Sequence, residues 1–164
     1  MNTLKLGGFS LAMFAVAVIG WGGFASEGQT QEKKAATETK AAAHSDHHAM
    51  GMMACAQACS NCQRACDGCA THCAHQLQAG HKEHMATLMS CQDCSTFCAA
   101  ASQIVSRNGP FSSLVCTGCA DACANCAKEC EKFADDAHMK ACAAECRKCE
   151  KACREMLTHA AATK

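Results

Sequence analysis

Cysteines recur along this chain at steps of three and four residues, and this spacing restricts the fold more than any other feature. The eighteen cysteines fall into four groups. They are Cys55, Cys59, Cys62, Cys66, Cys69 and Cys73; Cys91, Cys94 and Cys98; Cys116, Cys119, Cys123, Cys126 and Cys130; and Cys142, Cys146, Cys149 and Cys153. Steps of three and four average about 3.5 residues, the period of a buried helical seam in a left-handed bundle. The spacing therefore predicts four helices, each with cysteine where leucine would ordinarily lie.

Ordinary core residues are scarce in the same region. After position 48 the only Val, Leu, Ile or Phe residues are Leu77, Leu88, Phe97, Ile104, Val105, Phe111, Leu114, Val115, Phe133 and Leu157. Each would contribute roughly 1.5 to 3 kcal/mol if fully buried. The conformational entropy opposing folding of a 100-residue domain is on the order of 100 to 200 kcal/mol. Cysteine, alanine and methionine must therefore fill most of the interior.

The gaps between the cysteine groups carry helix-ending signals. Gln78-Ala79-Gly80 closes the first segment, Asn108-Gly109-Pro110 separates the second from the third, and Asp135-Asp136 can cap the fourth. Short connections favour antiparallel neighbours. We therefore predict an all-α fold, an up-down-up-down antiparallel four-helix bundle with a cysteine-lined interior, over residues 49–162.

The N-terminal part reads differently. Residues 1–25 have a positive residue, Lys5, an apolar stretch over 9–19 and small residues before Ala25, which is the pattern of a signal peptide. An uncleaved membrane anchor is the alternative, although the apolar run is shorter than the ~20 residues of a spanning helix. Residues 26–48 are polar with a His-rich end and predict a flexible tether. These features predict an exported protein, periplasmic or extracellular.

Two roles suit so many thiols: crosslinking and metal binding. Side chains one helical turn apart have Cβ atoms roughly 5 to 6 Å apart, whereas a disulfide needs about 3.5 to 4.5 Å. Disulfides within a helix are therefore disfavoured, and bridges between helices remain as a disulfide-stabilised structural alternative. Soft thiolate and thioether ligands select Cu(I).

Cu(I) bound between two thiolates separates the sulfurs by about twice a metal–sulfur bond, on the order of 4 to 4.5 Å. Each pair one turn apart is then a candidate two-coordinate site. Sharing of sulfurs would lower the buried negative charge, so capacity lies between about nine and about eighteen Cu(I) ions by ligand counting. A metallothionein-like zinc or cadmium binder is a further alternative, although structural zinc usually has isolated tetrahedral sets.

Other function classes have little support. The formal net charge is +0, and no basic block indicates nucleic-acid binding. No nucleophile with its base and no phosphate loop is recognisable. We therefore expect a binding protein and not an enzyme.

The cysteine rows on four predicted helices resemble the copper storage proteins, which are cysteine-lined four-helix bundles. The resemblance covers about residues 49–160. It implies coordination of many Cu(I) ions by the eighteen cysteines, a homo-oligomer, and a role in copper storage or sequestration. Some exported relatives carry an arginine pair in the signal, which this chain lacks.

Methionines and histidines extend the cysteine rows and predict routes for metal entry. In the antiparallel topology one end gathers His44, His47, His48, Met50, Met52, Met53, Met156 and His159, and the other gathers His72, His75, His81, His84, Met85, Met89, His138 and Met139. Methionine also serves as core filler, and a single histidine is commonly a solvated surface residue. The candidate entry residues are His48, Met50, Met52, Met53, Met139 and Met156.

The predicted function is Cu(I) storage in copper homeostasis. The expected partners are copper ions and copper donor or acceptor proteins, with no nucleic acid and no stable membrane insertion after signal cleavage.

Overall fold

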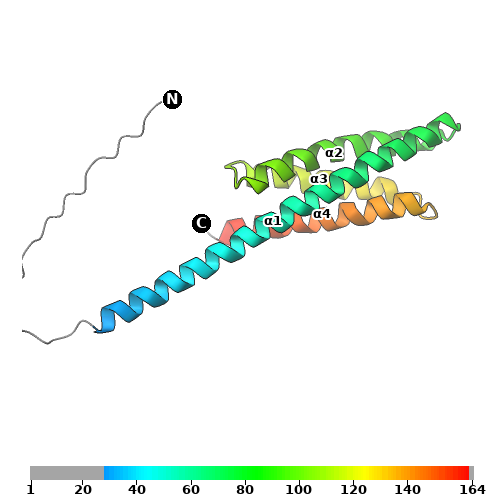
Figure 1. Ribbon diagram of the computed structural model, residues 1–164. Helices are drawn as coiled ribbons and strands as arrows, with labels where there is room; N and C mark the ends of the chain where they lie inside the picture. Colours follow the sequence, from blue (N-terminus) through cyan, green and yellow to red (C-terminus); the bar gives the residue numbers. More distant parts are fainter. Residues whose placement is uncertain (1–27, 163–164) are drawn as a thin grey trace, which may run out of the picture. The chain divides into compact units, whose positions relative to one another are not determined.

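The computed structural model describes the backbone of residues 28–162 and the side chains of residues 49–160. This part contains four α-helices and a short 3-10 helix: α1 (Gly28–Gln78), η1 (Lys82–His84), α2 (Met85–Ser106), α3 (Ser112–Glu131) and α4 (Ala137–Ala162). The chain divides into two compact units, residues 1–37 and 38–164. The four helices of the second unit run alongside one another (Figure 1), which confirms the predicted all-α bundle.

The helix ends lie where the sequence placed them. Gly80, two residues after α1, has φ of +99°, and Asn108, two residues after α2, has φ of +50°. Such conformations suit glycine and asparagine and end a helix. The Asp136 carboxylate accepts the backbone N–H groups of His138 at 2.8 Å and Met139 at 3.1 Å and so caps α4. No sequence pattern predicted the short helix η1.

The start of α1 differs from the prediction. The backbone is helical from Gly28, whereas we expected a tether over residues 26–48. This stretch is rich in alanine, glutamate and lysine, which have high intrinsic helix propensity, so a helix can form without a core-facing pattern. The predicted signal peptide, residues 1–25, lies outside the described residues.

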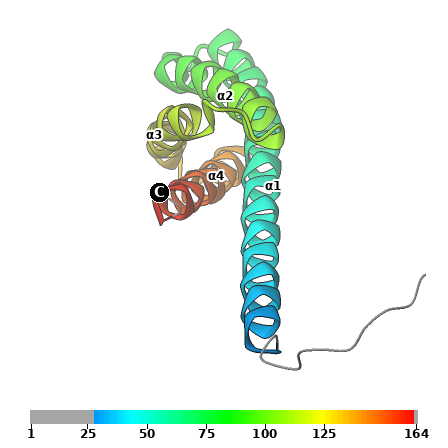
Figure 2. The ribbon, with the colours of Figure 1, turned by 90° about the vertical axis from the view of Figure 1, so that its left-hand side faces the viewer.

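Contacts between the helices fix an up-down-up-down order. Ser60 early in the bundle part of α1 meets Ser102 late in α2, with 2.9 Å between the hydroxyl oxygens. The Sγ atoms of Cys55 and Cys153 are 3.8 Å apart, which pairs the same part of α1 with the end of α4. Cys69 lies 3.9 Å from Cys130 at the other end of α3. α1 and α3 therefore run one way and α2 and α4 the other, with the four helices enclosing one core (Figure 2).

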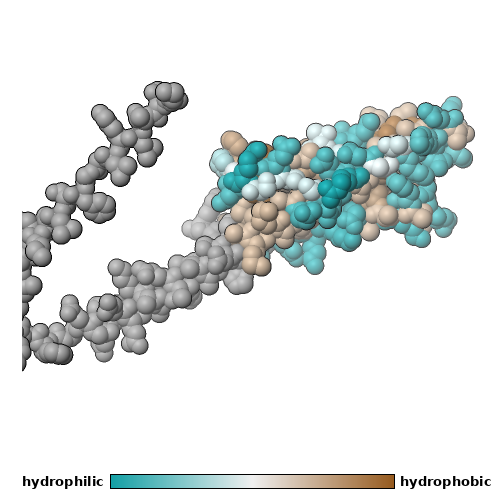
Figure 3. Space-filling model, in the orientation of Figure 1, coloured by the Kyte–Doolittle hydropathy of each residue, from teal (hydrophilic) through white to brown (hydrophobic). Residues whose placement is uncertain are grey.

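Polar residues cover most of the face shown in Figure 3, with apolar residues in smaller patches. Ion pairs join neighbouring helices on the surface: Arg147 of α4 donates to both carboxylate oxygens of Glu131 of α3 at 2.9 Å. No helix in the described part of the chain is long and apolar enough to cross a membrane.

Candidate metal centre

The centre of the bundle is built from sulfur. All eighteen cysteines are free and buried, and alanines such as Ala101, Ala120 and Ala127 fill the space between them. The period of three and four places each thiol on the inward stripe of its helix. The predicted cysteine-lined interior is confirmed, and the inter-helix disulfide scaffold is not what the structure contains.

The sulfurs contact one another between facing helices as well as along each helix. Cys59 of α1 lies 3.6 Å from Cys153 and 3.7 Å from Cys149, both of α4. Cys62 of α1 lies 3.8 Å from Cys123 of α3. Contacts also occur along single helices, as between Cys62 and Cys66 at 3.9 Å and between Cys119 and Cys123 at 4.0 Å. Helix packing brings facing thiols together as closely as one turn does.

Several thiols converge in groups of four. Within each group all sulfurs lie within 4.8 Å of one another, and the groups include Cys59, Cys119, Cys149 and Cys153; Cys62, Cys94, Cys98 and Cys123; Cys62, Cys66, Cys94 and Cys146; Cys66, Cys126, Cys142 and Cys146; and Cys69, Cys91, Cys130 and Cys142. Neighbouring groups share members such as Cys62 and Cys142. The centre is therefore a connected array of soft ligands.

Burial and mutual hydrogen bonds shift the thiol pKa values in opposite directions. Desolvation, followed by the neighbouring Cys69 and Cys142, raises the pKa of Cys73 to about 12. Hydrogen bonds from Cys123 and then Cys146 lower the pKa of Cys62. Because a thiol must lose its proton to bind a metal, metal binding by this array would release protons.

Thioethers extend the array at both ends. Met52 and Met156 are each only 5% exposed, and they lie three residues beyond Cys55 and Cys153, whose sulfurs are in contact. Met50 and Met53, at 70% and 58% exposed, stand outside the core. The side chain of His48 lies outside the described part. At the other end Met139 is fully buried, with its Sδ atom 3.4 Å from Cys69 Sγ.

A histidine cluster adjoins Met139. The His72 ring stacks on that of His138 with 4.8 Å between centroids, and His72 Nε2 lies 2.8 Å from the Asp136 carboxylate. His84 is buried and stacks on Phe133 at 4.1 Å. The sequence placed these histidines at one end of the bundle. It did not predict Asp136 as the partner of His72, because that contact depends on how α4 begins.

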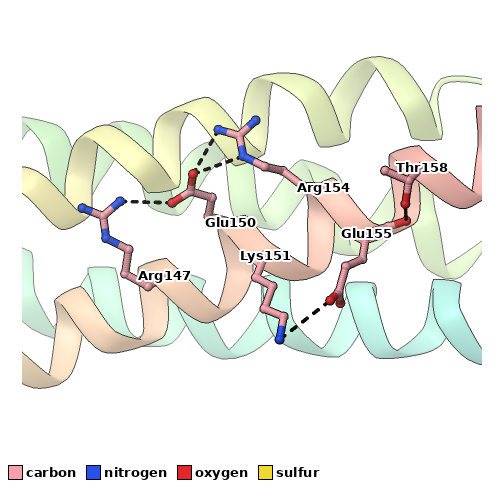
Figure 4. Close-up of a pocket in the computed structure, with 6 residues that line it drawn as sticks. All are labelled: Arg147, Glu150, Lys151, Arg154, Glu155 and Thr158. Atoms are coloured by element: carbon pink, nitrogen blue, oxygen red, sulfur yellow. Dashed lines mark hydrogen bonds and ion pairs between the residues drawn. The ribbon is translucent and has the colours of Figure 1, made fainter.

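The outer face of α4 carries a shallow pocket of charged residues. It is lined by Arg147, Glu150, Lys151, Arg154, Glu155 and Thr158 (Figure 4). Glu150 pairs with Arg147 at 3.1 Å and with Arg154 at 3.0 Å. These charges satisfy one another, as expected for a solvated helix face, and the pocket offers no soft ligand.

A family model described as "Csp: Copper storage protein" matches residues 30–158. A cytosolic copper storage protein from Streptomyces lividans, in a structure with five coppers, has a TM-score of 0.64 and 30% identity, covering 69% of this chain and 97% of its own. The same protein, Ccsp, loaded with 10 copper equivalents has a TM-score of 0.61 and 31% identity, covering 66% and 85%. The Cu(I)-bound copper storage protein BsCsp3, whose apo form is known from Bacillus subtilis, has a TM-score of 0.57 and 34% identity, covering 63% and 95%.

No curated protein matches the chain. The comparisons correct one prediction: export to the periplasm or the extracellular space is wrong, because the Streptomyces lividans relative is a cytosolic copper storage protein. The prediction rested on the pattern of residues 1–25 alone.

Proposed function

The chain belongs to the copper storage protein family, and from this premise we propose that it stores Cu(I) ions in its sulfur core. The observation that carries the proposal is the core itself: every cysteine is free, buried and turned toward the others. Its relatives have been loaded with five and 10 coppers. Storage is binding without turnover, and we infer no catalytic role.

Soft-ligand chemistry supports Cu(I) as the stored ion. Thiolates and thioethers select Cu(I) over harder cations. With metal–sulfur bonds near 2.3 Å, three thiolates around one ion lie about 4.0 Å apart. Many sulfurs already stand at this spacing, for example Cys98 to Cys119 at 3.7 Å and Cys119 to Cys149 at 3.9 Å. Copper can therefore enter with small side-chain movements.

We propose all eighteen cysteines as ligands, namely Cys55, Cys59, Cys62, Cys66, Cys69, Cys73, Cys91, Cys94, Cys98, Cys116, Cys119, Cys123, Cys126, Cys130, Cys142, Cys146, Cys149 and Cys153. The shared four-sulfur groups favour bridging thiolates, because a bridged cluster carries less net negative charge into the dry core. A capacity between about nine and about eighteen ions follows from ligand counting.

We propose that copper enters at the end formed by Met50, Met52, Met53 and Met156. Two exposed thioethers there adjoin two nearly buried ones, so an ion can pass from solvent-facing ligands to Cys55 and Cys153. Copper donor and acceptor proteins would meet the molecule at this end, and we propose that the protein assembles into a homo-oligomer.

Titration of the reduced protein with Cu(I) against a competing chelator tests the function. The sequence contains one tryptophan and no tyrosine, so ultraviolet bands from Cu(I)-thiolate binding stand out against a weak protein background. We expect at least about nine tight equivalents, with affinity falling as pH is lowered, because each ligand must lose a proton. Fewer than about four tight equivalents would refute storage.

A zinc or cadmium store is the second candidate, and the four-thiolate groups are the observation that favours it. Sulfurs in a tetrahedral site with bonds near 2.3 Å lie about 3.8 Å apart, close to the 3.8 Å of Cys62 and Cys123. Competition discriminates the two: Cu(I) should displace bound Zn²⁺ completely, whereas retention of Zn²⁺ in excess Cu(I) would favour the zinc store.

A further inference from the structure

An exposed apolar patch covers the outer side of α2 and α3. Phe97 of α2 is 45% exposed, and Phe111 and Leu114 of α3 are 64% and 72% exposed. The Phe97 ring lies against the backbone of α3, because a Cβ atom at Gly118 would stand only 2.9 Å from its Cε1 atom. Seven residues along each antiparallel helix, about two turns, the half-buried Ile104 and Phe111 return to the same face at a common level. These four apolar side chains form one surface, the α2–α3 patch.

The α2–α3 patch is nearly free of charge, unlike the outer face of α4. Residues 94–120 contain a single charged residue, Arg107. On α4, by contrast, Glu150 pairs with both Arg147 and Arg154. Contiguous exposed apolar surface marks interaction sites. Exposed aromatic side chains with little charge among them are typical of the centre of a protein–protein interface.

Opposite charges flank the two ends of the α2–α3 patch. Asp93 lies one turn before Phe97 on α2, and Asp121 lies about one turn beyond Gly118 on α3, where it pairs with an arginine of α4. Both carboxylates therefore stand at the same end. Arg107, directly after α2, stands at the other end, about 21 Å from the level of Asp93 by helical rise. All three charged side chains are exposed.

We propose that the α2–α3 patch is the contact between two copies of this chain, arranged antiparallel about a two-fold axis. A two-fold contact places the same surface on both copies. This axis would bring Arg107 of each copy opposite Asp93 of the other, so the charge pattern is complementary to itself. The inference rests on the proposed homo-oligomer, to which it adds a contact surface, and it does not require bound copper.

Size and chemistry favour a second copy over other occupants. Helix α2 has 22 residues, or about 33 Å, and two helices side by side offer a face on the order of 600 Å², close to the ~800 Å² that each partner contributes to a standard interface. A copper donor needs soft ligands beside its docking site, but residues 94–120 contain no Met or His, and their cysteines are buried. A membrane surface needs several basic residues beside the apolar ones, and this segment has one.

Sedimentation equilibrium of the full copper-free chain tests the patch. The wild type should associate, and Leu114→Glu should raise the dissociation constant of this contact by at least about a hundredfold, because a charge then lies at the interface centre. Thr158→Glu, which puts the same charge on the outer face of α4, is the matched control and should associate like the wild type. Circular dichroism establishes that the variants fold.

Phe111→Ser provides a second variant in case Leu114→Glu does not fold. Phe111 occupies the N-cap position of α3, where serine is favoured, so this change keeps the helix and removes only the exposed ring. It should weaken association by about tenfold. A wild type that stays monomeric at concentrations on the order of 100 μM, or a folded patch variant that associates as tightly as the wild type, would overturn the proposal.

Charge reversal tests the antiparallel arrangement. Arg107→Glu and Asp93→Lys should each weaken self-association by about tenfold, since like charges then face one another. An equimolar mixture of the two variants should associate as tightly as the wild type, because every facing pair is again of opposite charge. A mixture that associates no more tightly than either variant alone would refute this arrangement. Failure of copper storage is a separate result, because the wild type would then bind fewer than about four Cu(I) equivalents whatever its mass.

Discussion

At the scale of single residues, Asp136 shows how one side chain serves two parts of the structure. One carboxylate oxygen accepts two backbone N–H groups of α4, and the other lies 2.8 Å from His72 Nε2. The sequence predicted a cap from the pair Asp135-Asp136 but could not choose between them. The choice depends on the backbone angle at which the chain enters α4, and local sequence does not determine that angle.

The cap predicts a difference between the two neighbouring aspartates. Asp136→Ala should lower the unfolding free energy of the copper-free protein by about 1 to 2 kcal/mol, the usual cost of losing an N-cap. Asp135→Ala, at an exposed position, should change it by less than about 0.5 kcal/mol. Urea unfolding followed by circular dichroism measures both. Equal losses in the two variants would contradict the capping role.

At the scale of helices, small residues set how closely the elements approach. Ala120 and Ala127 are fully buried on α3, seven residues apart and on the same face as its cysteines. Their short side chains let thiols of facing helices come within 4 Å, as between Cys123 of α3 and Cys98 of α2 at 3.6 Å. Alanine in this sequence is therefore a spacing device as well as a helix former.

Enlarging one of these alanines should push the helices apart. Ala127→Leu is expected to cost about 1 to 3 kcal/mol by overpacking. It should also reduce the number of tightly bound Cu(I) ions, because the sulfurs near Cys126 and Cys130 would separate. Asn125→Leu, an exposed change on the same helix, is the control and should leave both quantities close to wild type. Unchanged copper binding in a folded Ala127→Leu protein would show that this spacing is unimportant.

The same scale separates what the sequence could predict from what it could not. The cysteine period and the breaks at Gly80 and Asn108 were enough for four helices and their order. The pairing of thiols was not predictable: Cys59 contacts Cys149 and Cys153 because of the axial register between α1 and α4, and register follows from packing of the whole bundle. The helical start of α1 was also missed, because this stretch has high intrinsic helix propensity but no core-facing pattern of apolar residues.

At the scale of the whole molecule, buried thiols make the stability of the copper-free protein depend on pH in the alkaline range. Burial raises the pKa of Cys73 from its ordinary value of 9.0 to about 12. A thiol with a raised pKa in the folded state contributes its full stability below pH 9 and loses it as the pH rises toward 12. The unfolding free energy of the copper-free protein should therefore fall over this interval.

Denaturant titrations between about pH 8 and about pH 11 measure the effect. The Cys73→Ala protein should show a smaller decline, because it lacks this titrating thiol. The copper-loaded protein should show little decline, since its thiols are already deprotonated by the metal. A steeper decline in Cys73→Ala than in the wild type would contradict the assignment.

The four-sulfur groups have a mechanical consequence. Cys59, Cys119, Cys149 and Cys153 come from α1, α3 and α4, so an ion held by them is a bond between three helices. Without copper the helices are held together by side-chain packing, whereas bound copper ions also crosslink them along the length of the bundle. Ions that bind only the folded state stabilise it by mass action. The free energy of unfolding should therefore rise with the amount of copper stored, and it should fall as copper is withdrawn.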